Sequence, residues 1–541
     1  MRFQDIDKIQ NRIHWGDGTF SDYTLLRFPS AGFRFLDIDQ QEPQVKLRDA
    51  AYLRWVKAIG RGETAPRIMA FLRLEQDRPA SELFPDLHRR TFPEGLLTEA
   101  GEELFSANSL ITHTLRTLLG RGWLRYERGR WQTTVPARET AWRQRGQAVL
   151  ALLEREGRLR LELGPGVRPP DTVDFDDFAV RLNLIPVGRL AFPRDLVWRE
   201  RPRIAFNTAF FLLEHNDFFS FHSALGEPFG LFVQDGVIRR PPLYRRGTLF
   251  QRDNGQWQTW MLSMEDVSIA LPSGIVVTFE SFYPQRAPGG RVFPFALNAQ
   301  AEVTAYTRLY GTASVGRVLG RTPIEGGRVE LTIIDQRVVG WKAGGGLDIP
   351  QNGFILSFAQ GVLASETLSA LRARPVVSYR FMREEHQDTV QALQVAPLLV
   401  QGGQSVITPT RLAEEEFWVD RLDDDGHVEI GVVPTEFPDD VDRTRAGRVG
   451  LGVDRKGRLV MVGAPGVEKK AKHLEADSHG VTLAELADLL ADAGAVEAIN
   501  LDGGGSTQVF FLGGLATVAG GRLGLPGVQY ERMVPSIGVL R

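Results

Sequence analysis

Near the C-terminus of this chain, a predicted helix and a predicted strand lead directly into three consecutive glycines. Thr482 and Glu485 form a T-x-x-E capping box, which predicts a helix over Leu483–Asp492. Its apolar side chains share one helical face: Leu483, Leu486, Ala487 and Leu490. Val496–Leu501 then reads as an apolar strand, and the residues DGGGST follow it without a break. The chain must therefore bend sharply at the end of a core strand, with Asp502 at the bend.

This glycine bend, residues 502–507, has the composition of a loop that binds a phosphate or a sugar. Glycines let the backbone approach a ligand closely and turn its N–H groups toward it. Ser506 and Thr507 add two hydroxyls as adaptable hydrogen-bonding groups. The spacing and the lysine of a Walker A loop are absent, and the Rossmann fingerprint is absent too. The alternative is a simple glycine turn that Asp502 caps.

Composition excludes several classes of chemistry. The 541 residues allow two to four domains, and 43% hydrophobic with 24% charged residues is typical of globular proteins. A net charge of −3 gives no support for whole-chain binding to a polyanion. The chain has no cysteine, which excludes disulfides, thiolate nucleophiles, iron–sulfur clusters and cysteine-ligated zinc.

The beginning of the chain predicts its location. Residues 1–16 are polar and lack the apolar segment of a secretory signal. No apolar run approaches the 18 residues that a membrane-spanning helix needs. We therefore expect a cytoplasmic protein with no membrane partner.

A turn-rich stretch at Leu163–Val173 predicts a boundary between two domains, residues 1–165 and 175–541. In the first, predicted helices over 110–119 and 138–156 flank a predicted hairpin over 123–134. Helix, basic hairpin and helix form the outline of a winged helix, which binds nucleic acid. The alternative is a small helical domain with a solvated hairpin.

The second part is rich in predicted strands and has few helices. Short apolar strands separated by glycine-rich turns are expected at Ser268–Phe279, Val329–Thr332, Val338–Trp341 and Gly353–Phe358. The predicted fold class is α+β or α/β, with a strand-rich, mixed-sheet catalytic domain and a smaller helix-rich N-terminal domain.

The helix, strand and glycine bend together resemble the phosphodiester glycosidase family. That family has the patterns G-[MLV]-T-L-x-E-L-A and A-[IV]-N-L-D-G-G-G-S-[ST], which appear here at 480–487 and 498–507. Weaker matches follow in the family's order at 204–211, 226–236, 306–311, 349–357, 448–454 and 531–537. The resemblance covers about residues 200–541 and implies the strand-rich catalytic fold of that family.

The chain departs from the family pattern at three places. Thr208 and Ala209 replace paired glycines, and Val449 replaces a threonine. Residues 463–466 (GAPG) stand where the family has an Asp-Gly turn. These changes bear on the identity of the substrate more than on the fold.

The resemblance implies hydrolysis of a sugar-1-phosphodiester at the anomeric C–O bond, which releases the sugar and a phosphomonoester. Phosphate is a weakly basic leaving group, so we expect cationic groups and one carboxylate rather than two carboxylic acids. The resemblance places Asp502, Arg448 and Arg532 in catalytic roles, with the two arginines binding phosphate. It implies that these residues bind substrate: Asn207, Asp235, Asn500, Gly503, Gly504, Gly505, Ser506, Thr507 and His479.

Two of these residues have ordinary alternative explanations. Asp235 precedes a glycine, which is typical of a turn, and His479 could be a solvated loop residue or a proton shuttle.

Residues 423–426 (DDDG) suggest calcium, but Arg421 and Val432 occupy positions where an EF-hand needs acids. No metal site and no cofactor are therefore predicted, although a divalent metal such as calcium stays compatible with the sequence.

Three functions are compatible with these patterns. The first is a hydrolase that takes a small-molecule or glycan phosphodiester, including a nucleotide-linked one. The second is a non-catalytic sensor of sugar phosphates whose N-terminal winged helix binds DNA. The third is a structural component, which would leave the glycine bend unused.

Overall fold

The computed structural model describes twelve longer stretches of the chain and several short pieces. The longer stretches are 5–37, 121–127, 130–157, 201–212, 226–272, 274–277, 303–307, 321–373, 375–415, 444–466, 478–517 and 534–541. The short pieces are 68–73, 159–163, 172–173, 185–187, 285–286, 292–293, 521–522 and 529–530, with single residues in 84–118 and at 193, 197 and 532.

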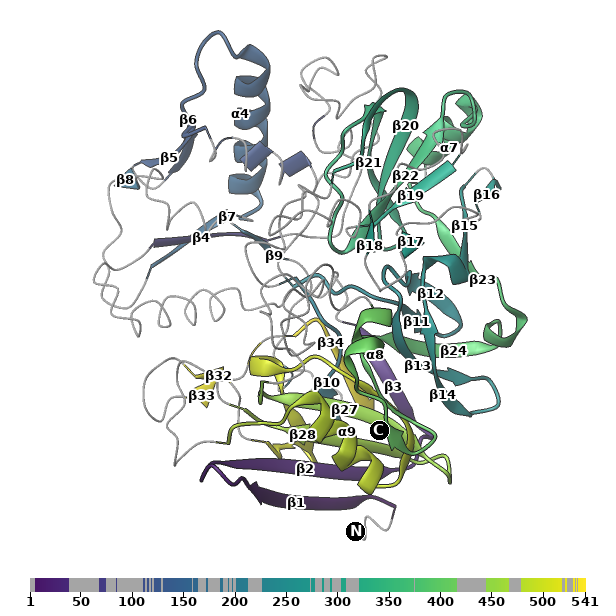
Figure 1. Ribbon diagram of the computed structural model, residues 1–541. Helices are drawn as coiled ribbons and strands as arrows, with labels where there is room; N and C mark the ends of the chain where they lie inside the picture. Colours follow the sequence, from purple (N-terminus) through teal and green to yellow (C-terminus); the bar gives the residue numbers. More distant parts are fainter. Residues whose placement is uncertain are drawn as a thin grey trace.

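A seven-stranded sheet in the order β1-β2-β28-β27-β29-β25-β26 carries the glycine bend (Figure 1). Every pair of neighbouring strands in it is antiparallel. Its strands are β1 Asp7–His14, β2 Phe20–Phe28, β28 Leu459–Ala464, β27 Arg448–Asp454, β29 Ala495–Asn500, β25 Leu398–Gln401 and β26 Gln404–Ser405. Helix α9 (Leu483–Asp492) packs on this sheet, and leucines 486 and 490 fill the space above Gly450.

A second sheet, in the order β3-β34-β10-β30-β31, joins the two ends of the chain. Its strands are β3 Phe33–Asp37, β34 Ser536–Leu540, β10 Ile204–Asn207, β30 Val509–Phe511 and β31 Gly514–Leu515. The rings of Phe33 and Phe206 stack with centroids 5.8 Å apart, and Trp257 meets Phe33 edge-on. These rings belong to a continuous apolar core under both sheets.

The remaining large sheets come from the middle of the chain. One has the order β12-β11-β24-β13-β14, with strands Val237–Arg240, Phe232–Gln234, Thr389–Gln394, Arg246–Arg252 and Trp257–Leu262. The other has the order β19-β22-β20-β21, with strands Val303–Tyr306, Gly353–Ala359, Ile324–Ile334 and Arg337–Gly345. A three-stranded sheet follows the order β16-β15-β23, with strands Val276–Val277, Val267–Ala270 and Ser378–Phe381. Helices α7 (Ser365–Ala373) and α8 (Pro409–Glu414) complete this region.

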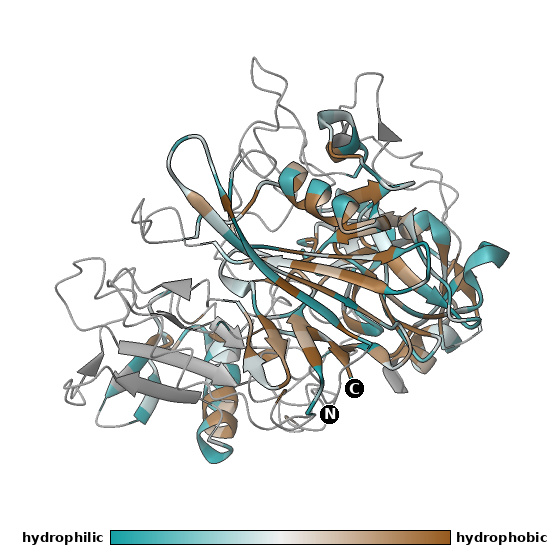
Figure 2. Cartoon of the chain, turned by 90° about the horizontal axis from the view of Figure 1, so that it is seen from below, coloured by the Kyte–Doolittle hydropathy of each residue, from teal (hydrophilic) through white to brown (hydrophobic). Residues whose placement is uncertain are grey.

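Hydrophobic and hydrophilic residues separate as a strand-rich fold requires. Seen from below, hydrophobic segments run along the strands, and hydrophilic segments lie at turns and on the outer faces of helices (Figure 2). No helix in the described part of the chain is both long and apolar enough to cross a membrane. The predicted strand-rich fold of the second part is confirmed.

The predicted boundary at residue 165 is wrong for the first 37 residues. β2 pairs with β28, and β3 pairs with β34, so both strands lie inside sheets of the C-terminal part. The physical reason is that a strand finds its partners through hydrogen bonds between segments far apart in the sequence, which the local pattern does not reveal. The sheets of the C-terminal part therefore include strands from residues 7–37.

The described residues of the rest of the N-terminal part do not show a helix-rich domain. They contain the helix α4 (Thr140–Arg155) and helical residues between 110 and 118. The predicted hairpin is present as β5 (Leu124–Glu127) and β6 (Arg130–Thr133), which β8 (Thr172–Val173) joins. A further sheet has the order β7-β4-β9, with strands Leu159–Leu163, Ile68–Arg73 and Ile185–Val187. Helix, hairpin and helix thus occur in the predicted order, but within a mixed α and β region.

Candidate functional site

The strand β29 delivers Asp502 to the glycine bend, as the sequence predicts. β29 ends at Asn500, and the bend continues as a single 3-10 turn over Gly504–Ser506 before β30 begins. The predicted capping box is present at the start of α9, because Thr482 and Glu485 bond reciprocally. Helix, strand and bend are therefore confirmed as one local unit.

Each of the three glycines has its own structural reason, a close contact for Gly503 and Gly505 and a positive φ for Gly504. A Cβ on Gly503 would lie 2.4 Å from the carbonyl oxygen of Gly447. Gly504 has a φ of +57°, and its N–H donates to the same oxygen at 2.6 Å. A Cβ on Gly505 would lie 2.5 Å from Nη2 of Arg532. Close packing of protein groups thus accounts for Gly503 and Gly505, and a left-handed backbone accounts for Gly504, around which nothing lies within 4 Å of a Cβ.

The amides of Gly503 and Gly504 make hydrogen bonds within the protein. The Gly503 N–H donates to Oδ1 of Asp502 at 2.9 Å, and the Gly504 N–H donates to Gly447. Both donors are therefore occupied inside the bend. The structure gives these two residues a role in shaping the bend, and the substrate contact that the resemblance implies for them stays a prediction.

Other glycines extend this close packing to two neighbouring segments. A Cβ on Gly466 would lie 2.4 Å from the amide nitrogen of Gly447, and one on Gly480 would lie 1.9 Å from the carbonyl oxygen of Ala446. Gly480 also has a φ of +72°. Four backbone segments, around residues 447, 466, 480 and 504, therefore meet without side chains between them. The GAPG departure from the family pattern supplies Gly466 to this junction.

Asp502 is a buried carboxyl with a strongly raised pKa. Its side chain is withdrawn from solvent, and burial raises its pKa to about 7. The Ser506 side chain, the Arg532 charge, the Gly503 amide and the Arg448 charge all act in the opposite direction. Among the described residues, no hydrogen bond reaches Oδ2 of this carboxyl. At neutral pH this carboxyl exists in both protonation states.

Both predicted arginines converge on this carboxyl. Arg532 lies with its guanidinium against Gly505, and Arg448 is the first residue of β27, directly after Gly447. Arg448 is buried and donates from Nη2 to the carbonyl of Thr444 at 3.4 Å. Each guanidinium is near enough for its charge to lower the pKa of Asp502. Residues about 30 and 54 positions away in the sequence are thus brought to one bend.

Asn207 connects the two sides of the glycine bend. Its Nδ2 donates to the carbonyl of Asp502 at 2.6 Å, and its Oδ1 accepts from the amide of Gln508 at 3.0 Å. Both ends of the side chain amide are therefore engaged on either side of the bend. The structure gives Asn207 this bridging role, and its predicted contact with sugar hydroxyls stays a prediction.

The residues that depart from the family glycines take part in the same framework. The carbonyl of Thr208 accepts from the Asp502 amide at 2.8 Å. The Thr208 hydroxyl lies 2.7 Å from the Ser536 hydroxyl, which also accepts from the amide of Ala209 at 3.0 Å. Sequence reasoning missed Gln508 and Ser536. Gln508 directly follows Thr507, and Ser536 comes four residues after Arg532, so both lie close to predicted site residues in the sequence.

The other predicted polar residues of the bend are buried. Asn500 donates from Nδ2 to the carbonyl of Ala396 at 3.0 Å, which ties the end of β29 to the start of β25. Ser506 and Thr507 are both almost fully buried. Of these three residues, Ser506 acts directly on the Asp502 carboxyl through its effect on the pKa.

His479 and Asp235 are placed differently from their predicted surroundings. His479 is buried, its amide donates to the carbonyl of Phe20 at 2.9 Å, and it pairs with Gly466 beside the junction. It is therefore not a solvated loop residue. Asp235 is exposed in the turn between β11 and β12 with a φ of +51°. That position is typical of a turn residue and gives no support to substrate binding.

The described residues include no group of three or more His, Asp or Glu side chains close enough together to hold a metal ion. The acidic run at 423–426 lies outside the described residues. The site thus combines one buried acid, Asp502, with two cationic side chains, Arg448 and Arg532. Such a set can bind an anionic ester and move a proton.

Residues 329–539 match the family model of the phosphodiester glycosidases. This match contains Asp502, Arg448 and Arg532, and it confirms the predicted resemblance over that segment. The family is a group of glycosidase-like hydrolases of phosphodiesters. A comparison with curated proteins finds no match.

Two solved structures illustrate what the chain is similar to. A hypothetical protein from Synechocystis is 15% identical, with a TM-score of 0.40, over 99% of this chain and 62% of that one. The catalytic domain of zebrafish N-acetylglucosamine-1-phosphodiester alpha-N-acetylglucosaminidase is 17% identical, with a TM-score of 0.22, over 54% of this chain and 81% of that one. This chain thus spans less than two thirds of the Synechocystis protein.

Proposed function

We propose that this protein hydrolyses a sugar-1-phosphodiester at its anomeric C–O bond. The observation that carries the proposal is that the buried Asp502 carboxyl shares the glycine bend with the guanidiniums of Arg532 and Arg448. The family match of residues 329–539 supports the same reaction class. The substrate is a small-molecule or glycan phosphodiester, including one linked to a nucleotide.

The two guanidiniums bind the phosphodiester. A guanidinium presents parallel N–H groups that fit two oxygens of a phosphate, and its charge stays positive at all physiological pH values. Because the phosphate leaves as an anion, these charges stabilise the transition state more than the ground state. The leaving group therefore needs no strong general acid.

Asp502 acts as the general base for water. A pKa of about 7 suits a base that works near neutral pH, because it is ionised in a large share of molecules and still accepts a proton readily. The oxygen of water bonds to the anomeric carbon as the bond from that carbon to the phosphate oxygen breaks. The water proton passes to Asp502, and the products are the free sugar and a phosphomonoester.

The test is turnover of a panel of sugar-1-phosphodiesters by the full chain, with the released phosphomonoester measured after phosphatase treatment. We expect Asp502→Asn to lower kcat at least about 100-fold, because the base is lost. Arg532→Lys should lower kcat/KM about 10- to 100-fold, because lysine lacks the planar fork. Asp235→Asn and Arg252→Lys are matched controls, since neither residue contacts the bend in the described structure.

Full activity of Asp502→Asn would refute its role as the base. No turnover of any member of the panel by the unmodified chain, with binding of sugar phosphates retained, would favour the sensor instead.

A further inference from the structure

The hairpin of β1 and β2 has a tip at residues 15–22, which comprises the turn after β1 and the first three residues of β2. This tip packs against the junction of backbone segments around residues 447, 466, 480 and 504. It lies outside the segment that matches the family model. Its turn is closed by Oδ1 of Asp17, which accepts from the amide and the hydroxyl of Thr19 at 2.9 Å and 2.6 Å. The tip is therefore an ordered structure with defined contacts.

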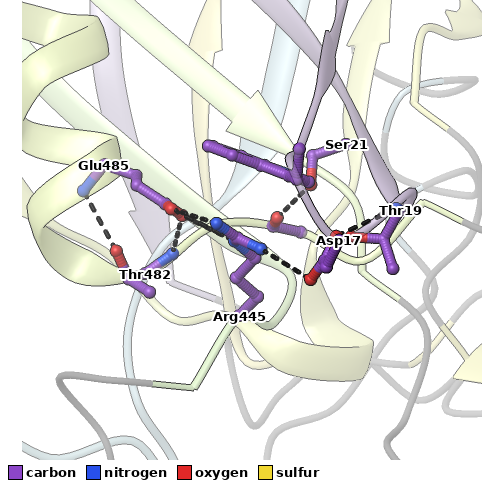
Figure 3. Close-up of polar contacts among 8 residues, drawn as sticks. Asp17, Thr19, Ser21, Arg445, Thr482 and Glu485 are labelled. Carbon is purple, nitrogen blue, oxygen red and sulfur yellow. Dashed lines mark hydrogen bonds and ion pairs between the residues drawn. The ribbon is translucent and has the colours of Figure 1, made fainter.

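Arg445 joins this tip to helix α9. Its guanidinium lies over the ring of Trp15, with Cζ 3.6 Å from the ring centroid. Nη2 lies 2.7 Å from Oε1 of Glu485, and Nη1 lies 3.6 Å from Oδ2 of Asp17. Figure 3 shows the Arg445 side chain between these two carboxylates.

The same hairpin tip also holds the segment around Gly480. Nε1 of Trp15 donates to the hydroxyl of Ser21 at 2.8 Å, and this hydroxyl donates to the carbonyl oxygen of Gly480. The carbonyl of Phe20 accepts from the His479 amide at 2.9 Å. Glu485 adds a bond from the other side, because its Oε2 accepts from the Thr482 amide at 2.9 Å (Figure 3).

A short chain of contacts leads from Arg445 to Asp502. Ala446 follows Arg445 and exchanges backbone hydrogen bonds with Val481 at 3.3 Å and 3.0 Å. The next residue, Gly447, accepts at its carbonyl oxygen from the Gly504 amide, and the Gly503 amide binds the Asp502 carboxylate. The backbone segments at this junction are in direct contact, because glycines place no side chains between them. A shift of residues 445–447 therefore moves the bend as well.

We propose that Trp15 and Arg445 are positioning residues for the Asp502 site. They do not touch the substrate, and they fix the Gly447 carbonyl against which the bend is formed. The inference rests on the proposed function for its catalytic consequence. The structural part, a coupling between the hairpin tip and the bend, stands without it.

The test compares Trp15→Ala, Trp15→Phe and Arg445→Lys with the unmodified full chain. Arg12→Lys is the matched control, since Arg12 also pairs with an aspartate and lies 3.9 Å from the centroid of the Phe20 ring, on the same hairpin. The first readout is hydrogen exchange of a peptide covering 501–508, measured by mass spectrometry. We expect at least 10-fold faster exchange there in Trp15→Ala and Arg445→Lys, and little change in Trp15→Phe and Arg12→Lys.

The second readout is steady-state kinetics on the substrate found in the panel. Misplacement of the bend should lower kcat about 10-fold in Trp15→Ala and Arg445→Lys, with KM changed less than about 3-fold. Trp15→Phe should recover most of the activity, because it keeps an aromatic face under the guanidinium.

Faster exchange confined to residues 5–37, with 501–508 unchanged, would overturn the proposal. Equal losses of kcat in Arg12→Lys and Arg445→Lys would overturn it too, because a general loss of stability then explains both. If the unmodified chain turns over no phosphodiester, the proposed reaction fails while hydrogen exchange still decides the coupling.

Discussion

The guanidinium of Arg532 occupies the space that a side chain on Gly505 would fill, since a Cβ there would lie 2.5 Å from Nη2 and 2.7 Å from Cζ. Glycine is therefore needed at position 505 because it has no side chain, and not because of backbone flexibility. It lets a cationic side chain from near the C-terminus lie against the bend that carries Asp502.

Gly505→Ala should separate activity from stability. The added methyl group must displace the Arg532 guanidinium, a flexible group, so we expect a loss of about 1 kcal/mol in stability. Turnover should fall about 10- to 100-fold, because the displaced charge no longer faces the phosphate. The measurements are kcat/KM and thermal denaturation, with Gly514→Ala as control, since its nearest neighbour to a Cβ lies 3.7 Å away. A normal rate for Gly505→Ala would contradict the phosphate-binding role of Arg532.

The pH dependence of the rate should report the Asp502 carboxyl. Its pKa is about 7, so kcat/KM should rise about tenfold per pH unit below 7 and level off above it. The slope has this sign because only the ionised carboxylate accepts a proton from water. A profile that falls as the pH rises through 7 would show that Asp502 acts as an acid instead.

The pH dependence of stability should change in Asp502→Asn. A carboxyl whose pKa rises on folding, here from 3.8 to about 7, favours the folded state at low pH. This contribution is complete below pH 3.8 and is lost as the pH rises to 7. Relative to the unmodified chain, the variant should gain roughly 3 kcal/mol in stability between pH 5 and pH 8.

Denaturation of both proteins at several pH values measures this gain. The comparison between variants is needed because burial also raises the pKa of Glu330 and of Glu415 to about 7. Both of those carboxyls titrate in the same window and cancel in the difference. Identical pH profiles for the two proteins would mean that the Asp502 carboxyl is not perturbed by folding.

Gly480→Ala should destabilise the junction strongly. The new Cβ would lie 1.9 Å from the Ala446 carbonyl oxygen, and a φ of +72° adds strain. We expect a loss of about 3–5 kcal/mol in stability. Gly494→Ala is the control, because its φ of +90° gives similar strain with nothing within 4 Å of the Cβ. Thermal denaturation of the two variants separates the steric clash from the backbone strain, and equal losses would show that the clash is relieved by movement.

Much of the local structure could be predicted from the sequence, because it depends on neighbours along the chain. The capping box at Thr482 and Glu485, the apolar face of α9 and the strand before Asp502 all follow from short-range patterns. The hairpin at β5 and β6 follows in the same way. The family patterns added Arg448 and Arg532, which local physics alone does not connect with Asp502.

What the sequence did not reveal concerns contacts between distant segments. The side-chain amide of Asn207 forms hydrogen bonds with the backbone of Asp502 and of Gln508. Asp235 lies in an exposed turn. The N-terminal strands pair with strands more than 400 residues away in the chain, so a boundary judged from composition misplaces them.

The sequence by itself determined that a core strand ends in an acid and three glycines after a capped helix, because hydrophobic periodicity and capping act within a few residues. Only the tertiary structure decided what the glycines are for. It places the backbone of Gly447 and the side chain of Arg532 against them, and it buries Asp502 deeply enough to raise its pKa to about 7. Such effects depend on which distant groups exclude water from a site, and no local pattern contains that information.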